Sequence, residues 1–231
     1  MAKSKLYRAQ MACYDRQRVY LLNEAVGVLK KFPQVKFNQT VELAIKLGID
    51  TRQSDQALRG ATSLPHGTGK TVRVVVAAEG DAATAAREAG ADFVGMSDLV
   101  EKLNGGWLDF DVMIATPDAM REIRKLGRVL GPRGLMPNPK TGTVTDDTGS
   151  AVREAKGGRI EYRADKGGCV HVPVGKVSFT ETALQENVQA IIHVINRARP
   201  AAAKGAYIIS ATLSATMSPG IRVDTREFTR S

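Results

Sequence analysis

A row of hydroxyl side chains near the C-terminal end is the clearest candidate for chemistry. Over 209–216, Ser210, Thr212, Ser214 and Thr216 alternate with Ile209, Ala211, Leu213 and Ala215. In a β-strand this alternation gives one apolar face and one face that carries only hydroxyls. Hydroxyls donate and accept at short range, which suits the phosphates and 2′-hydroxyls of RNA. Exposure to solvent explains the same row equally well.

A second candidate is the stretch 127–143, which contains four glycines and three prolines. Glycine permits positive φ and proline removes a backbone donor, so we expect neither helix nor strand to run through it. Basic residues far outnumber acids around this stretch. From 121 to 140 the one acid is Glu122, and the basic residues are Arg121, Arg124, Lys125, Arg128, Arg133 and Lys140. Such a loop can hold phosphates or form a long ordered connection between two packed bodies.

Catalytic and cofactor patterns have little support. The segment 67–71 resembles a phosphate-binding loop, but Leu64 stands where its first glycine is needed, and a strand follows it instead of a helix. A lone Gly80 follows the strand that ends at Ala78, where a dinucleotide site needs three glycines. The histidines and cysteines lack metal or nucleophile spacing: His66, His171, His193, Cys13 and Cys169. We therefore predict no enzyme, cofactor, metal or small-molecule substrate.

Composition indicates a folded protein with an anionic partner. The 231 residues are 43% hydrophobic and 25% charged, with a net charge of +9 and a pI near 9.7. Aromatic residues make up only 5%, which argues against base-stacking platforms and favours nucleic acid recognised by its shape. No apolar run reaches membrane-spanning length and the start has no signal-peptide core, so we expect a cytoplasmic protein.

The middle of the chain alternates strands and helices. We predict strands over 72–78, 92–94 and 110–115, and helices over 81–88, 97–103 and 117–126. This order is typical of parallel strands with right-handed crossovers, so we expect a small Rossmann-like body.

The flanking segments predict a mixture of helices and strands. Helices are expected over 23–31, 150–155 and 180–198, and strands over 38–47, 159–164, 169–174, 207–216 and 221–224. The strand over 38–47 alternates, with Gln39, Val41, Leu43, Ile45 and Leu47 on its core face. Residues 48–70 are predicted to be an irregular linker, and 165–168 a hairpin turn between two paired strands.

Charge divides the chain in the same way. Residues 71–158 contain 11 lysines and arginines against 13 acids, whereas the flanks contain 22 against 11. All of the excess positive charge therefore lies outside the middle. We predict that the flanks pair as one discontinuous α+β domain and carry the surface for a polyanion.

The run Leu130–Val144 closely resembles the signature of the bacterial large-subunit ribosomal protein L-one family, the stalk protein of the large subunit. The resemblance extends from Tyr20 to about Val223. It includes 36–37, 40–43, 59–61, 64–70 and 216–217.

The resemblance implies two domains and an RNA-binding function. A split α+β sandwich domain of 1–68 and 159–231 would bind 23S ribosomal RNA at the mobile stalk, and 69–158 would form the inserted Rossmann-like domain. The family also implies contact with exit-site tRNA, release of that tRNA, translational repression of the protein's own operon mRNA, and a monomer within the cytoplasmic ribosome. The implied RNA-binding residues are Lys36, Phe37, Thr40, Lys166, His171, Ser210, Thr216 and Met217. The interdomain or secondary contact loop is Gly131, Pro132, Arg133, Gly134, Pro137 and Lys140.

Two positions depart from the family pattern. Gln39 stands where the family usually has glutamate, and 218–220 reads Ser-Pro-Gly where glycine usually follows Met217. The residue before a proline favours extended φ and ψ, so the loop after Met217 is expected to take a shifted path. An enzyme built on the middle segment and a nonspecific basic DNA-binding protein stand as alternative functions.

Overall fold

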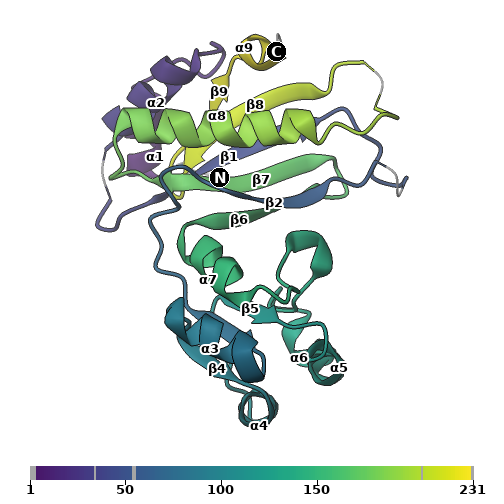
Figure 1. Cartoon of the computed structure of the whole chain (residues 1–231). Helices are drawn as coiled ribbons and strands as arrows, with labels where there is room; N and C mark the ends of the chain where they lie inside the picture. Colours follow the sequence, from purple (N-terminus) through teal and green to yellow (C-terminus); the bar gives the residue numbers. More distant parts are fainter. Residues whose placement is uncertain (1–3, 34, 54–55, 204, 230–231) are drawn as a thin grey trace. The chain divides into compact units, whose positions relative to one another are not determined.

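The computed structural model describes residues 4–33, 35–53, 56–203 and 205–229 and has a mixed α/β architecture (Figure 1). The expected fold class is confirmed at this level. Contacts divide the chain into unit 1, Met1–Gly69 with Ile160–Ser231, and unit 2, Lys70–Arg159. Each end of unit 2 lies one residue from the expected domain boundaries.

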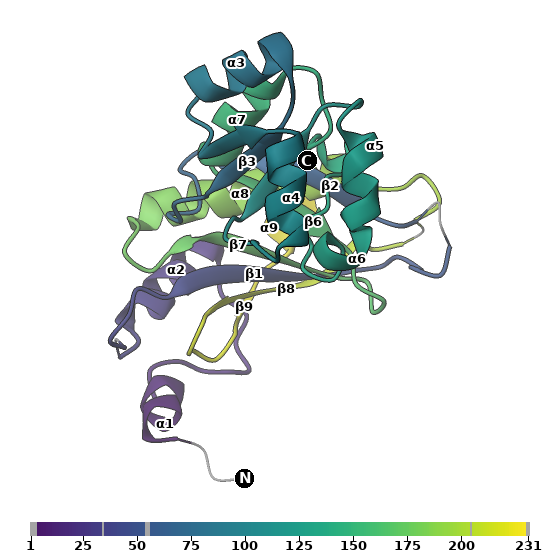
Figure 2. The ribbon, with the colours of Figure 1, turned by 90° about the horizontal axis from the view of Figure 1, so that it is seen from below.

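Unit 1 is built on a four-stranded antiparallel sheet in the order β7-β1-β8-β9 (Figure 2). Its strands are β1 (Thr40–Leu47), β7 (Cys169–Lys176), β8 (Ile208–Ala215) and β9 (Ile221–Val223). In β1 the four residues from Val41 to Leu47 that alternate toward the core are all buried. The predicted inward face of this strand is confirmed, and Gln39, just before it, is also buried.

Two amphipathic helices cover one face of this sheet. They are α2 (Leu22–Lys31) and α8 (Glu181–Arg197), and in Figure 1 α8 runs across the strands. The side chain of Thr180 accepts from the N–H of Ala183 and caps α8, whose apolar stripe then packs on the sheet. Burial of this stripe against the strands removes apolar area from water and so favours folding of unit 1.

The segment expected to be an irregular linker contains a strand. β2 (Arg59–Ser63) pairs with β6 (Arg159–Arg163) in a separate two-stranded sheet. Only Gly60, Ala61 and Thr62 are even partly buried in β2, so it lacks the apolar alternation that predicts strands. Pairing with β6 decides its conformation instead. The hairpin predicted between the strands over 159–164 and 169–174 is also shorter than expected, because a single bridge, Ala164 to Val170, pairs the two segments.

Unit 2 contains the predicted parallel sheet, in the order β4-β3-β5. The strands are β3 (Val74–Ala77), β4 (Phe93–Gly95) and β5 (Val112–Ala115), and the helices beside them are α3 (Gly80–Glu88), α4 (Ser97–Asn104), α5 (Met120–Ile123) and α7 (Thr148–Lys156). Alternate residues of β3 enter two apolar clusters, one with α4 and α5 and the other with α3 and α7. Both faces of this sheet are therefore covered, as is usual for parallel strands.

The glycine- and proline-rich stretch begins as a helix. α6 (Gly127–Leu130) follows the 3-10 helix η1 (Arg124–Leu126), and η2 (Pro139–Thr141) lies further on. The expectation that no helix enters this stretch is wrong for its first four residues. Gly127 and Gly131 have φ of −56° and −58°, so both are helical. Only Gly134 and Gly142 use positive φ, at 71° and 66°.

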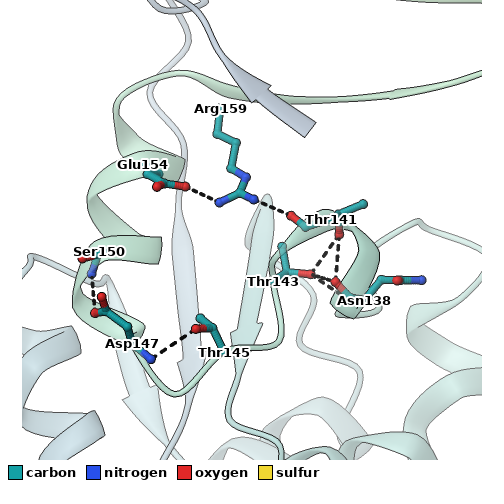
Figure 3. Close-up of polar contacts among 8 residues, drawn as sticks. All are labelled: Asn138, Thr141, Thr143, Thr145, Asp147, Ser150, Glu154 and Arg159. Atoms are coloured by element: carbon teal, nitrogen blue, oxygen red, sulfur yellow. Dashed lines mark hydrogen bonds and ion pairs between the residues drawn. The ribbon is translucent and has the colours of Figure 1, made fainter. Parts of the chain in front are cut away.

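The far end of the stretch is tied down by its own side chains (Figure 3). The N–H of Asn138 donates to Thr143 Oγ1 at 2.8 Å, and Thr141 Oγ1 donates to the carbonyl of Asn138 at 3.1 Å. Arg159 donates to the carbonyl of Thr141 at 2.7 Å and also pairs with Glu154 on α7. These bonds satisfy polar groups of a loop whose threonines are buried.

The loop then extends the parallel sheet of unit 2. The N–H of Ala115 donates to the carbonyl of Thr143 at 3.0 Å, and the N–H of Thr145 donates back to Ala115 at 3.1 Å. Leu135 and Met136 pack on the cluster beside α4 and α5. The stretch is thus an ordered part of unit 2.

Candidate nucleic-acid interface

The open face of the unit 1 sheet is the side opposite α2 and α8. Strand register brings four rungs together across it, because β7, β1 and β8 are paired in order. The facing residues are Lys46 with Cys169 and Ser210, Ala44 with His171 and Thr212, Glu42 with Pro173 and Ser214, and Thr40 with Lys176. Hydroxyls, small residues and lysines therefore form one continuous surface, which we call the open face.

Thr216 and Thr40 meet at one end of the open face. The N–H of Thr40 donates to Thr216 Oγ1 at 3.2 Å, and the N–H of Thr216 donates to the carbonyl of Thr40 at 3.1 Å. Lys176 Nζ donates to Thr40 Oγ1 at 2.7 Å. The two hydroxyls are thereby oriented by protein groups while the Thr216 side chain stays exposed.

The backbone of Met217 is held by the buried side-chain amide of Gln39. Its N–H donates to Oε1 of Gln39 at 2.8 Å, and Gln39 is only 4% exposed, whereas Met217 is 53% exposed. Ser218 closes the turn, because its Oγ accepts from the N–H of Ala215 at 2.8 Å. Both departures from the family pattern therefore shape this one loop. Phe37, 52% exposed, and the exposed Lys36 lie in the bend before β1.

His171 lies midway along the open face, where its side chain contacts that of Glu42. Its Nδ1 is 2.8 Å from Oε1 of Glu42, and both side chains are about half exposed. Glu42 is the only acid among the facing residues of the paired rungs. The pair lowers the local excess of positive charge between the two ends of the face.

Lys166 belongs to the turn at the opposite end of the open face. Asp165 Oδ1 accepts from the N–H groups of Gly167 and Cys169, each at 2.8 Å. These backbone donors, first that of Cys169, hold the pKa of the Asp165 carboxyl below its ordinary value. Thr51 Oγ1 donates to the carbonyl of Lys166 at 2.8 Å and fixes the turn from the other side.

A β-bulge corrects the predicted apolar face of β8. Leu47 pairs with Ile208 and Lys46 with Ser210, so Ile209 is an extra residue between them. Ile208 is 4% exposed and Ile209 is 54% exposed. Ile209 was predicted to face the core, but the bulge shifts the alternation by one residue and turns it outward. The row of Ser210, Thr212 and Ser214 keeps its predicted face.

Three cationic side chains on this surface were missed by the sequence prediction. Lys46 and Lys176 face the open side from β1 and β7, and Arg222 of β9 lies beside Thr212. The alternation of β1 already assigned Lys46 to the outward face, so this signal was available. Lys176 and Arg222 depend on strand order, which the sequence does not give.

The predicted contact loop lies entirely in unit 2. Gly131, Pro132, Arg133 and Gly134 are exposed, whereas Pro137 is buried. Lys140 lies in η2, and its side chain falls outside the described residues. Any role of this loop in contacts between the units or with a partner stays a prediction.

The structure gives the phosphate-loop-like segment a different role. Gly67–Thr71 leads into β3, and Lys70 Nζ donates to Oδ1 of Asp111 at 2.5 Å. Asn187, buried on α8, receives the N–H of His66 and donates to the carbonyl of Gly67, both at 3.1 Å. The segment is a structural support.

Among the described residues, no cluster of three metal-ligating side chains occurs and no helix is long and apolar enough to cross a bilayer.

The net charge differs between the two units. Unit 2 contains 13 lysines and arginines and 13 acids, whereas unit 1 contains 20 against 11. The whole net charge of +9 therefore belongs to unit 1, which carries the open face.

Comparison with known sequences agrees with the resemblance seen in the motifs. The profile of the Ribosomal protein L1p/L10e family matches residues 29–219. The chain belongs to this family. The match covers the open-face residues from Lys36 to Met217 and all of unit 2.

Three similar proteins from this family carry the name Large ribosomal subunit protein uL1. Those of Chlamydia trachomatis serovar D and Protochlamydia amoebophila are 55% and 53% identical to this chain. They cover 96% and 97% of it and 96% and 95% of their own lengths. That of Saccharophagus degradans is 57% identical over 93% of each chain. These names describe ribosomal proteins, so the prediction that this member of the family is not an enzyme is confirmed.

Proposed function

We propose that this protein is a structural constituent of the large ribosomal subunit that binds 23S ribosomal RNA through the open face. The observation that carries the proposal is the gathering of Thr40, His171, Ser210 and Thr216 on one bare sheet face, with Lys36, Phe37, Lys166 and Met217 at its two ends. Hydroxyls and lysines match phosphate and 2′-hydroxyl groups, which are the features that RNA presents whatever its sequence.

The division of charge supports the same function. A basic surface attracts the phosphates of RNA over a Debye length of about 8 Å, whereas unit 2, which has no net charge, adds no net attraction. We therefore propose that unit 1 is a separate RNA-binding domain and unit 2 an inserted Rossmann-like domain.

The finer functions follow from the family resemblance. The target RNA is a helix–loop at the mobile stalk, and the bound protein is a monomer in the cytoplasmic ribosome. It contacts deacylated tRNA at the exit site, helps to release it, and represses translation of its own operon mRNA through a mimic of the ribosomal site.

A titration of the full chain against a helix–loop stalk RNA, with bulk duplex DNA as competitor, tests the proposal. Met217→Ala removes an exposed thioether that can pack on a sugar or base edge, so we expect affinity to fall roughly five- to tenfold. Val129→Ala in unit 2 is the matched control, because Val129 is also an exposed apolar side chain, 38% exposed. Equal affinity for duplex DNA, or equal loss in both variants, would refute specific RNA binding by the open face.

Gln39 provides a second, structural variant of the test. Gln39→Met removes the acceptor of the Met217 N–H but keeps a side chain of similar length, whereas Gln39→Glu keeps an acceptor. An unsatisfied N–H costs about 1–3 kcal/mol, so the first variant should loosen the loop and weaken RNA binding. The second should keep the loop. If both variants bind RNA as the parent does, the Gln39 contact does not position Met217 for RNA.

A further inference from the structure

A concavity of about 640 Å³ lies at the corner of the open face where β8 meets β9. Its walls include Val19, Ile209, Ser210, Thr212, Arg222 and Arg226. The volume falls within the range of about 300–1,000 Å³ that is usual for sites that hold small organic groups. The family resemblance assigned no function to this corner beyond Ser210.

Two apolar side chains are turned into this corner by local structure. Ile209 is outward because of the bulge in β8, and it is 54% exposed. Val19 is 52% exposed and precedes Tyr20, whose backbone pairs with Val223 and so extends the sheet beyond β9. Exposed aliphatic side chains that line a hollow suit a flat apolar group in contact with them.

The polar groups of the same hollow suit a nucleotide. Arg222 and Arg226 are exposed, and guanidinium groups bind phosphate in a two-point geometry. Ser210 and Thr212 continue the hydroxyl row of the open face into the cavity. Asp224 also lines it, and its Oδ1 accepts from the N–H of Arg226 at 2.9 Å. A carboxylate has further acceptor positions that fit the amino groups of bases.

We propose that this concavity, the β8–β9 pocket, takes one unpaired nucleotide of the RNA bound on the open face. Its base lies between Val19 and Ile209, and Arg222 contacts its phosphate. This inference rests on the proposed function and adds an enclosed site for one base to a face whose hydroxyls and lysines offer backbone contacts. Double-stranded RNA has no projecting base to fill a hollow, so the occupant is an unpaired nucleotide. An apolar peptide would leave two arginines and two hydroxyls without matching groups.

An abasic scan tests the pocket with the full chain. The probe is the stalk helix–loop RNA, with the base removed at one unpaired position at a time. We expect one position at which the parent protein loses roughly tenfold in affinity, because removal of the base exposes the apolar area that it covers on Val19 and Ile209. At the other unpaired positions the change should be much smaller.

Two variants then connect that position to the pocket. Ile209→Thr keeps the branched shape that β-strands accept and removes the apolar wall. Arg222→Gln removes the charge. Ile209→Thr should weaken binding of intact RNA and should abolish most of the extra loss at the critical abasic position. Arg222→Gln should weaken intact RNA and the critical abasic RNA by a similar factor, because an abasic position keeps its phosphate. The matched controls are Val129→Thr on unit 2 and Arg197→Gln on the helix-covered side of unit 1, which should leave both affinities unchanged.

The outcomes separate the pocket from the proposed function. If the parent chain does not bind the helix–loop RNA, both are wrong. If it binds and Met217→Ala weakens it, but Ile209→Thr leaves intact and abasic RNA unchanged, only the pocket is refuted. The pocket is equally refuted if Ile209→Thr weakens all abasic RNAs by the same factor, or if an apolar peptide occupies it without competition from RNA.

Discussion

Unit 1 packs α2 and α8 against one face of an antiparallel sheet, whereas unit 2 packs helices against both faces of a parallel one. In β1 every second residue is buried, but in β3 all four residues are. Antiparallel strands can leave a face to solvent, and parallel strands with helical crossovers rarely do. Among the described residues, the difference leaves a broad open sheet face in unit 1 and covers both sheet faces in unit 2.

Charge makes the same distinction. Unit 1 carries the net +9 and unit 2 is neutral. Net charge affects association and solubility and does not select a fold. Because the open sheet face and the excess positive charge both belong to unit 1, we infer that both serve binding of an anionic partner.

Separating the units should have the largest effect. A chain that joins Met1–Gly69 to Ile160–Ser231 should keep the affinity of the full chain for the helix–loop RNA within about threefold. Lys70–Arg159 alone should bind at least about 100-fold more weakly, because it lacks the net charge that drives association. Fluorescence titration of the three chains measures this. Binding by the intact chain alone would contradict the comparison.

Salt should weaken binding through unit 1 only. Each neutralised phosphate contributes about −0.7 to −0.9 to the log–log salt slope, so about four lysines of the open face predict a slope near −3 and roughly 60-fold weaker binding from 50 to 200 mM salt. The full chain and unit 1 alone should share this slope. A slope near zero, or one that needs all nine excess charges, would be inconsistent with a mixed polar and apolar interface.

Thr216→Val should have a smaller effect on RNA affinity. It keeps the β-branched shape and removes a hydroxyl, which we expect to cost about 1–3 kcal/mol of binding. Because that hydroxyl also accepts from Thr40 at 3.2 Å, a small decrease in melting temperature is expected as well. Thr84→Val on α3 is the control, since its hydroxyl also contacts a backbone carbonyl. RNA affinity equal to that of the parent would remove Thr216 from the interface.

Asp111→Asn should have the smallest effect and should spare RNA binding. Lys70, first, and the N–H of Arg73 hold the pKa of the Asp111 carboxyl below its ordinary 3.8. The stabilisation is therefore complete above that pH and is lost as the pH falls through the lowered pKa. Because the pair is partly exposed, the variant should lose only about 0.5–1 kcal/mol of unfolding free energy at neutral pH.

Urea unfolding near neutral pH and in strong acid checks the Asp111 prediction. The difference from the parent should disappear in acid, and Glu88→Gln, an exposed carboxylate on α3, should show none at either pH. Loss of RNA affinity in Asp111→Asn would show that the two units do not act separately.

Long periodic elements were predictable because their signal is local. The alternation of 40–47, the stripe of α8 and the strand and helix order of unit 2 follow from burial on one side or on both. Among the candidate site residues, the outward positions of Thr40, Ser210 and Ser214 followed from the same alternation. β2 and α6 were missed, since β2 forms by pairing with β6 and α6 uses glycines in ordinary helical geometry.

The sequence by itself determined the family, the charge division and which side of β1 faces the core. Tertiary structure decided the order β7-β1-β8-β9, the bulge that exposes Ile209 and the bond from Met217 to Gln39. Apart from the pairing of β8 with β9, these depend on contacts between residues more than 100 positions apart in the chain, such as Gln39 and Met217, whose sequence separation is 178. Local patterns record which face of a strand is apolar, but strand order and register are set by the total burial and hydrogen bonding of the assembled sheet.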